Sequence, residues 1–341
     1  MSSAARPEKD SKRSVVSTQI DEIRDRINRA RRTLATYFVN KAELIDLMTL
    51  CALAQEPLLL IGRPGTAKSD LVVKFCEALG LTGDEYFEYM LTKFTEPSEI
   101  IGPIDINLLK DGKYHRRVEG KLPCAKVVFL DEIFKSNSAI LNTLLTVINE
   151  RKFYQEGRPE PVEMRVLFAA TNEIPEFSEL DALKDRFILK AESTSVRDIA
   201  FDDLIEKGLR NEMYRVGNRK PWAGLTSLDD FERFKAYVDQ TMLNAVDEDA
   251  AGVDRQRYFP DEVFSLFKRI IRTLEREEHI EISDRKVIKL YRLMRVRAFL
   301  FHGGVVTREE LGLLKYVANR QQDIELVRNK VTALLAIEDS R

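Results

Sequence analysis

The stretch IGRPGTAKSD, Ile61 to Asp70, joins a short apolar run to an amphipathic helical pattern. The run PLLLIG (57–62) has the length and composition of a strand buried on both faces, and residues 67–79 repeat with helical period. A turn of glycine and proline between a strand and a helix that opens with Lys68-Ser69 is typical of a phosphate-binding loop. Such a loop usually has glycine before the lysine, whereas this chain has Ala67, which we expect to take ordinary helical angles.

Each part of this loop has a chemical reason to contact a nucleotide. Backbone N–H groups wrap the phosphates, the Lys68 ammonium neutralises the terminal phosphates, and the Ser69 hydroxyl helps to hold Mg²⁺. The sequence therefore predicts ATP and Mg²⁺ as cofactors. The loop residues expected to bind them are Gly62, Arg63, Pro64, Gly65, Thr66, Ala67, Lys68, Ser69 and Asp70. The alternative is a chance occurrence of glycine and proline before a helix.

Two later apolar runs also end in polar residues that suit hydrolysis. AKVVFLDE (125–132) delivers Asp131 and Glu132 to the carboxyl end of a predicted strand, where open α/β sheets bind ligands. Asp131 is the expected Mg²⁺ ligand, and Glu132 is expected to polarise the attacking water. MRVLFAATN (164–172) places Asn172 beside them to position that water. Taken singly, an acidic pair after a strand or an asparagine that caps a turn has a simple structural explanation. Three predicted strands that each end in a suitable polar residue, in the expected order, favour a catalytic site.

The pattern of apolar and polar residues divides the chain into four segments. Residues 1–17 are expected to be disordered, and residues 18–195 alternate short buried strands with helices, which predicts a parallel sheet covered on both faces. In this part we expect a helix over 18–37 and a second helix capped by Asn40. Residues 196–257 are a linker or insertion with one helix near 228–246, and no buried strand is expected after about residue 190. Residues 258–341 form an all-helical domain, with helices expected at 261–277, 284–301, 308–319 and 321–336.

Composition excludes several classes of protein. Charged residues make up 32% of the 341 residues but leave a net charge of only −2, so nothing favours nucleic acid or an anionic membrane as partner. No apolar run is long enough to span a bilayer, and the polar start is unlike a secretory signal. The three cysteines have no paired spacing, which indicates reduced thiols. These features predict a cytoplasmic protein.

The motifs in order, GRPGTAKS, VVFLDEI, AATNE, LKDRF and ISDR, resemble the MoxR branch of the AAA+ ATPases, and its RavA-like subgroup most. The resemblance runs from about residue 20 to 335 and is most specific over 92–187. It implies an α/β P-loop NTPase fold, with an AAA+ core and hairpin insertions, followed by a small all-helical lid domain. Alanine before the P-loop lysine is frequent in MoxR proteins, so Ala67 supports the assignment.

The resemblance also implies roles for residues outside the strands. Arg186 matches the arginine finger that reaches a neighbouring subunit's nucleotide, and Arg285 matches sensor 2, which contacts the nucleotide of its own subunit. Hairpins are implied in PIDINLLKDGKYHRRVEG and KFYQEGRPEPVEMR. A homo-oligomeric ring, hexameric in the family, would do chaperone-like work on a protein client with a von Willebrand factor A domain partner. Without the motif context, surface salt bridges would explain both arginines.

Three other functions stay open at this point. A P-loop kinase is disfavoured by the carboxylate pair, Asn172 and the lid motif. A nucleotide-gated binding module with little turnover is disfavoured by intact Glu132 but stays open, since a ring can stay idle without its partner. A nucleic-acid motor is disfavoured by the near-neutral charge.

Overall fold

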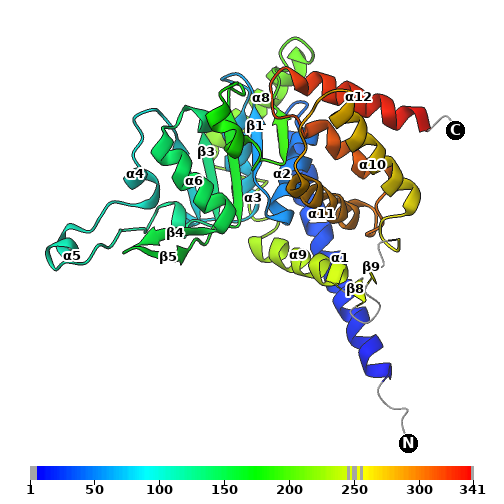
Figure 1. The fold of residues 1–341 in the computed structure, drawn as a ribbon, viewed down its shortest axis with the longest axis horizontal. Helices are drawn as coiled ribbons and strands as arrows, with labels where there is room; N and C mark the ends of the chain where they lie inside the picture. Colours follow the sequence, from blue (N-terminus) through cyan, green and yellow to red (C-terminus); the bar gives the residue numbers. More distant parts are fainter. Residues whose placement is uncertain (1–5, 244–245, 248–251, 254–255, 339–341) are drawn as a thin grey trace, which may run out of the picture.

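The computed structural model describes residues 6–243, 246–247, 252–253 and 256–338. A parallel sheet with helices on its faces forms one side of the molecule, and a group of helices forms the other (Figure 1). A slender arm that carries helix α5 extends from the sheet side, away from the helical part. The predicted architecture, an α/β core followed by a helical lid, is confirmed.

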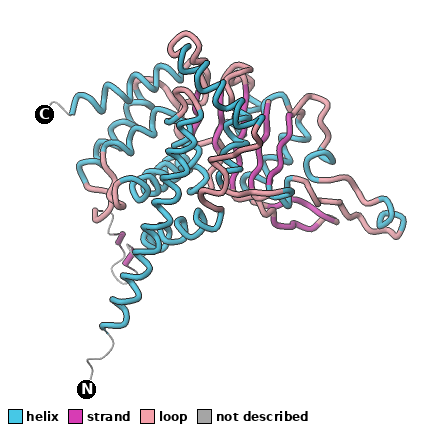
Figure 2. Tube along the Cα trace, turned by 180° about the vertical axis from the view of Figure 1, so that it is seen from behind, coloured by secondary structure: helices cyan, strands magenta, loops and turns pink. Residues whose placement is uncertain are grey.

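The central sheet has five parallel strands in the order β2-β3-β6-β1-β7. The strands of this sheet run side by side in Figure 2. The three predicted strands lie at its centre. The expectation of no buried strand after about residue 190 is wrong, because β7 pairs with β1 in parallel and buries three of its four residues. Buried Lys190 interrupts the apolar run that would have revealed this strand. The strands are β1 (Leu58–Ile61), β2 (Tyr86–Met90), β3 (Val127–Asp131), β6 (Val166–Thr171) and β7 (Leu189–Glu192).

Helix α1 begins earlier than the sequence predicted. Residues 6–17 were expected to be disordered, but α1 runs from Arg6, because the Glu-, Lys- and Arg-rich start continues a helix readily; residues 1–5 lie outside the described part. Asn40 does not cap α2, since the N-cap residue is Lys41 and Asn40 has a φ of 51°. The helices here are α1 (Arg6–Tyr37), α2 (Ala42–Ala54), α3 (Lys68–Ala78), α6 (Ser138–Glu150) and α7 (Asp181–Lys184), with 3-10 turns η1 (Gly83–Glu85), η2 (Leu122–Cys124), η3 (Ile133–Lys135) and η4 (Ser178–Leu180).

Two insertions project from the core. The first, after α4 (Pro97–Ile101), was expected to be a β-hairpin, but it contains a single bridge between Ile104 and Arg116 and the short helix α5 (Ile106–Lys110). Asp105 explains the helix, because its carboxylate accepts hydrogen bonds from the N–H groups of Asn107 and Leu108 and so caps a first turn. The second insertion is the predicted hairpin, made of antiparallel β4 (Lys152–Gln155) and β5 (Arg158–Pro161).

Helices α8 (Phe201–Val216) and α9 (Leu228–Leu243), from the predicted linker or insertion, contact the rest of the core. Helix α9 packs on α1, where the Arg26 guanidinium donates to Asp230 (3.1 Å), and Phe231 meets Phe75 of α3 edge to face. The expected helix at 308–319 is a 3-10 helix instead. The remaining elements are β8 (Val246–Asp247), β9 (Gly252–Val253), α10 (Asp261–Arg276), α11 (Asp284–Phe301), η5 (Arg308–Tyr316) and α12 (Asp323–Glu338).

Candidate nucleotide-binding and hydrolysis site

The phosphate-binding loop leaves β1 at Gly62 and enters α3 at Lys68. A Cβ at Gly62 would lie 2.4 Å from the carbonyl oxygen of Ser193, so only glycine fits there. The Ser193 hydroxyl donates to the carbonyl of Thr66 (2.8 Å), and the Thr66 hydroxyl donates to the carbonyl of Arg63 (2.8 Å). The end of β7 therefore holds the loop in shape from outside the motif.

Ala67 does not have the geometry expected from the sequence. Its φ of 64° and ψ of 24° lie in the left-handed region, so the expectation of ordinary helical angles is wrong. For a residue with a Cβ this conformation costs roughly 1–2 kcal/mol, whereas glycine adopts it freely. The loop therefore keeps the backbone shape that the usual glycine would give, with an alanine under strain.

Lys68 lies in the mouth of the loop. Its ammonium donates to the carbonyl oxygens of Gly62 and Arg63, the latter at 3.3 Å. Burial lowers the pKa of Lys68, and the nearby carboxylates of Asp131 and Glu132 act in the opposite direction. The loop and the acidic pair, which the sequence predicted as two parts of one site, therefore lie close enough for their charges to interact.

Asp131 and Glu132 stand at the carboxyl end of β3. The N–H of Glu132 donates to the Asp131 carboxylate (2.8 Å), and Glu132 has a left-handed φ of 54° that turns its side chain into a buried position. The Asn172 amide donates to Glu132 Oε1 (2.5 Å), and the Lys135 ammonium lies 3.2 Å from the same oxygen. The structure therefore brings Asn172 directly against Glu132, as the strand order predicted.

Oxygen donors suit a magnesium ion at this edge. The described residues contain no cluster of three or more His, Cys, Asp or Glu side chains that would form a closed metal cage. Mg²⁺ in phosphate-transfer sites is usually held by one or two protein oxygens together with the substrate phosphates and water. Asp131 after β3 and half-buried Ser69 on α3 fit that sparse requirement.

A cavity of about 180 Å³ adjoins the loop, and no pattern in the sequence indicated it. Its walls come from the loop, from residues 37–41 and from residues 194–211. Lys207 and Asn211 of α8 close one side by donating to the carbonyls of Phe38 (3.0 Å) and Tyr37 (2.9 Å). Its place beside the loop and its size suit the base of a nucleotide.

Lys41 is a second residue that the sequence analysis missed. It is buried, and its ammonium donates to the Ser193 hydroxyl (2.9 Å) and the Thr194 carbonyl (2.7 Å). Burial and the Lys68 ammonium both lower the pKa of Lys41. A lysine before a helix carries no motif, so only the tertiary structure reveals a second ammonium near the loop.

Arg186 and Arg285 lie together at a separate corner, where α7 meets the start of α11. Arg186 is paired with Asp185 (3.3 Å), which also accepts from the Ser283 hydroxyl (3.2 Å). Burial and the positive charge of Arg285 lower the pKa of Arg186. Within the described part of the chain, the buried Arg186 Nε has no hydrogen-bond partner. The corner thus holds two guanidinium groups near one carboxylate.

Comparisons with known proteins settle the family. A model of the MoxR domain in the MoxR-vWA-beta-propeller ternary systems matches residues 25–230, and an AAA lid domain matches residues 262–331. This chain belongs to the MoxR family of AAA+ ATPases. The predicted family is confirmed at this level, and its RavA-like subgroup stays a prediction.

Several curated proteins and one solved structure are similar to this chain. Two uncharacterized proteins of Methanocaldococcus jannaschii are 31% and 32% identical to this MoxR protein, over 92% and 87% of its length and 75% and 72% of theirs. Chaperone MoxR1 of Mycobacterium tuberculosis is 26% identical over 58% of this chain and 50% of its own. A crystal structure of a candidate ATPase from Cytophaga hutchinsonii is 16% identical and shares the fold, with a TM-score of 0.71 over 95% of this chain and 98% of its own.

No helix within the described ranges is both long and apolar enough to cross a membrane.

Proposed function

We propose that this MoxR protein assembles into a ring, a hexamer as the family resemblance implies. The ring would hydrolyse ATP at its subunit interfaces to remodel or activate protein clients. The observation that carries the proposal is the contact of Asn172 with Glu132, beside Asp131 and across from Lys68. A carboxylate held by an amide in this position is arranged to orient a water against a bound terminal phosphate.

The residues divide the chemistry among them. Lys68 neutralises the terminal phosphates, and Glu132 polarises the attacking water while Asn172 fixes its carboxylate. Mg²⁺ bound by Ser69 and Asp131 would offset charge on the phosphate oxygens. Arg186 of the neighbouring subunit would stabilise the charge that develops on the transferred phosphoryl group.

The family model suggests the partner. Its description names systems of MoxR with vWA and β-propeller proteins, which supports a von Willebrand factor A domain partner. The cytoplasmic location and the RavA-like subgroup are proposals of the same kind. Nucleic acid is disfavoured as a partner by the net charge of −2.

Two contacts on one oxygen favour a second function, a nucleotide-gated binding module with little turnover of its own. Glu132 Oε1 is engaged by both Asn172 and Lys135, which occupy the oxygen that would otherwise be open to a water. Hydrolysis would then wait until a partner or the neighbouring subunit rearranges these contacts.

Turnover per subunit as protein concentration rises through the micromolar range tests the proposal. We expect turnover to climb for the wild type and to stay low for Arg186→Ala and for Glu132→Gln. Mixing the two variants should restore activity, because an Arg186→Ala subunit has an intact site that a Glu132→Gln neighbour completes. Flat turnover with an active Arg186→Ala variant would instead indicate a self-contained site. Turnover that stays negligible at every concentration, with tight ATP binding, would favour the gated module.

A further inference from the structure

Helix α8 exposes an apolar stripe along its whole length. None of its residues is buried, and Leu209 and Met213 are 64% and 70% exposed. Residues four apart lie on one face of a helix, so the apolar side chains form a continuous line. The stripe consists of Phe201, Ile205, Leu209, Met213 and Val216.

The exposure of the stripe does not come from a loosely placed helix. The opposite face of α8 is fixed to the end of α1 and the segment after it, through the hydrogen bonds of Lys207 and Asn211 to the carbonyls of Phe38 and Tyr37. A helix held by one face with an apolar line on the other is typical of a docking surface.

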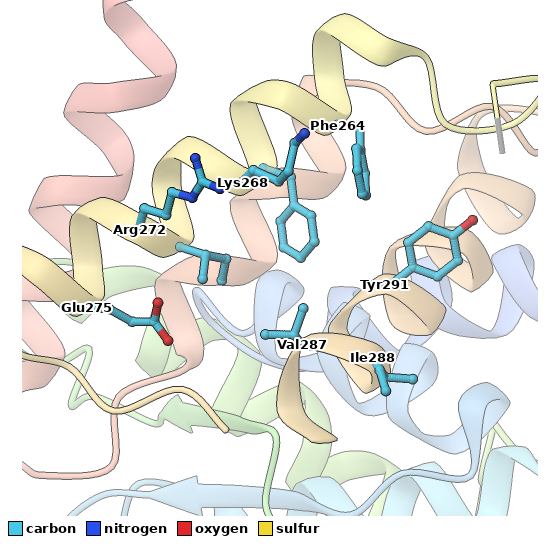
Figure 3. Close-up of a pocket in the computed structure, with 9 residues that line it drawn as sticks. Phe264, Lys268, Arg272, Glu275, Val287, Ile288 and Tyr291 are labelled. Carbon is cyan, nitrogen blue, oxygen red and sulfur yellow. The ribbon is translucent and has the colours of Figure 1, made fainter. Parts of the chain in front are cut away.

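A groove that suits such a helix lies in the lid of the same chain. Helices α10 and α11 enclose about 510 Å³ between apolar and aromatic side chains (Figure 3). Ile288, at its edge, is 63% exposed, and Lys268 and Arg272 lie exposed along α10. The apolar lining is formed by Phe264, Phe267, Ile271, Val287, Ile288 and Tyr291.

We propose that the α8 stripe of one subunit docks into the α10–α11 groove of a second copy of this chain. An amphipathic helix in an apolar groove is a common recognition mode, read out by anchors spaced three, four and seven residues apart. Leu209, Met213 and Val216 have that spacing. The net charges are of opposite sign, because α8 carries four acidic and three basic side chains, whereas the groove is lined by Lys268 and Arg272 with one acidic residue, Glu275.

The contact is heterologous, since each subunit offers a helix on one side and a groove on the other. Such contacts close into rings when the rotation between subunits allows it. The inference rests on the proposed ring and adds the surfaces that would build it. It also links neighbours to the nucleotide, because the inner face of α8 closes the cavity beside the P-loop.

Two substitutions at exposed positions test the docking. Leu209→Asp places a charge in the α8 stripe and leaves the groove unchanged. Ile288→Asp places a charge at the groove and leaves the stripe unchanged. Arg210→Gln, off the stripe on α8, and Ser265→Asp, exposed on α10 outside the groove, are controls that shift the charge by the same single unit. Mass in solution would be measured by analytical ultracentrifugation with Mg²⁺ and a non-hydrolysable ATP analogue, after unchanged melting temperatures confirm folding.

We expect each of the two variants to lose at least tenfold in self-association, while both controls assemble like the wild type. An equimolar mixture of the two variants should form a dimer and stop, because it offers one intact helix and one intact groove. Variants that assemble normally, a mixture that stays monomeric, or a wild type that never assembles would each overturn the docking. The proposed function is tested by a different experiment. It is contradicted if a mixture of Arg186→Ala and Glu132→Gln does not regain ATP turnover.

Discussion

The carboxyl edge of the sheet and the α7–α11 corner handle charge in opposite ways. At the sheet edge the Lys68 ammonium faces two carboxylates, and Glu132 is engaged by an amide and a lysine. At the corner Arg186 and Arg285 lie close together and Asp185 is the carboxylate that pairs with Arg186. The first region is balanced within one chain, whereas the second places two guanidinium groups next to one another, which is the arrangement that the proposed contact with a neighbour's phosphate would use.

Replacing Glu132 should give the largest effect, because it removes the base from the balanced region. We expect Glu132→Gln to lower ATP turnover by roughly 10²–10⁴-fold, the range of a positioned general base, with nucleotide affinity kept. Turnover would be measured by phosphate release and affinity by titration of a fluorescent ATP analogue. Glu163→Gln, an exposed change of the same type, is the control and should retain full activity. Equal loss of affinity and turnover would contradict the division of roles.

Arg285 tests whether the corner acts as one unit. We expect Arg285→Ala to lower turnover by about 10–100-fold, since one charged contact to a phosphate is lost. Its neighbour Arg186 is proposed to act on the adjacent subunit, so Arg285 should do the same. A mixture of Arg285→Ala with Glu132→Gln would then regain activity.

If Arg285 contacts the nucleotide of its own subunit, as the family resemblance implied, that mixture stays inactive. Both variants then carry a defective site, and no interface is complete. A mixture of Arg186→Ala with Glu132→Gln in the same assay serves as the reference for full complementation.

The parts of this molecule that the sequence predicted are those in which local chemistry is self-contained. The three central strands are unbroken apolar runs, and the polar residues after them follow from strand order. Strand β7 was missed because buried Lys190 interrupts its pattern and is satisfied only by distant partners, the Phe187 carbonyl (2.8 Å) and Asn319 (2.8 Å). The cavity beside the P-loop depends on α8 contacting residues 169 positions earlier, which no local pattern reports.

Two buried lysines, Lys190 and Lys286, lie close to the corner, and their effect should be visible in stability. Lys286 is fully buried, and its ammonium donates to the Val317 carbonyl (2.6 Å) and to Asn319 (3.0 Å), which Lys190 also contacts. Burial lowers the pKa of Lys286 to about 8, partly opposed by Asp185, and burial and the Lys286 charge lower that of Lys190 further.

Because the unfolded chain binds a proton on Lys286 above pH 8 and the folded chain does not, the free energy of unfolding should rise with pH there. From pH 8 to 9.5 we expect Lys286→Met to gain about 1.5 kcal/mol less than the wild type. Well below pH 8 Lys286 is protonated in both states, and the difference between the two proteins should become constant. Urea titrations at several pH values would measure it, with exposed Lys110→Met as control. Parallel pH profiles would show that Lys286 stays protonated in the fold.

The smallest expected effect concerns the strain at Ala67 in the otherwise balanced region. Ala67→Gly removes a left-handed Cβ but makes the unfolded chain more flexible, so we expect a net gain of roughly 0.5–1 kcal/mol in the free energy of unfolding. Ala333→Gly, at an exposed position inside α12, should lose about 1 kcal/mol, because there glycine adds only flexibility. Urea unfolding of both variants measures the two changes in the free energy of unfolding. The same substitution acting in opposite directions would locate the strain in the P-loop, whereas losses of equal size would mean that the loop is relaxed with alanine.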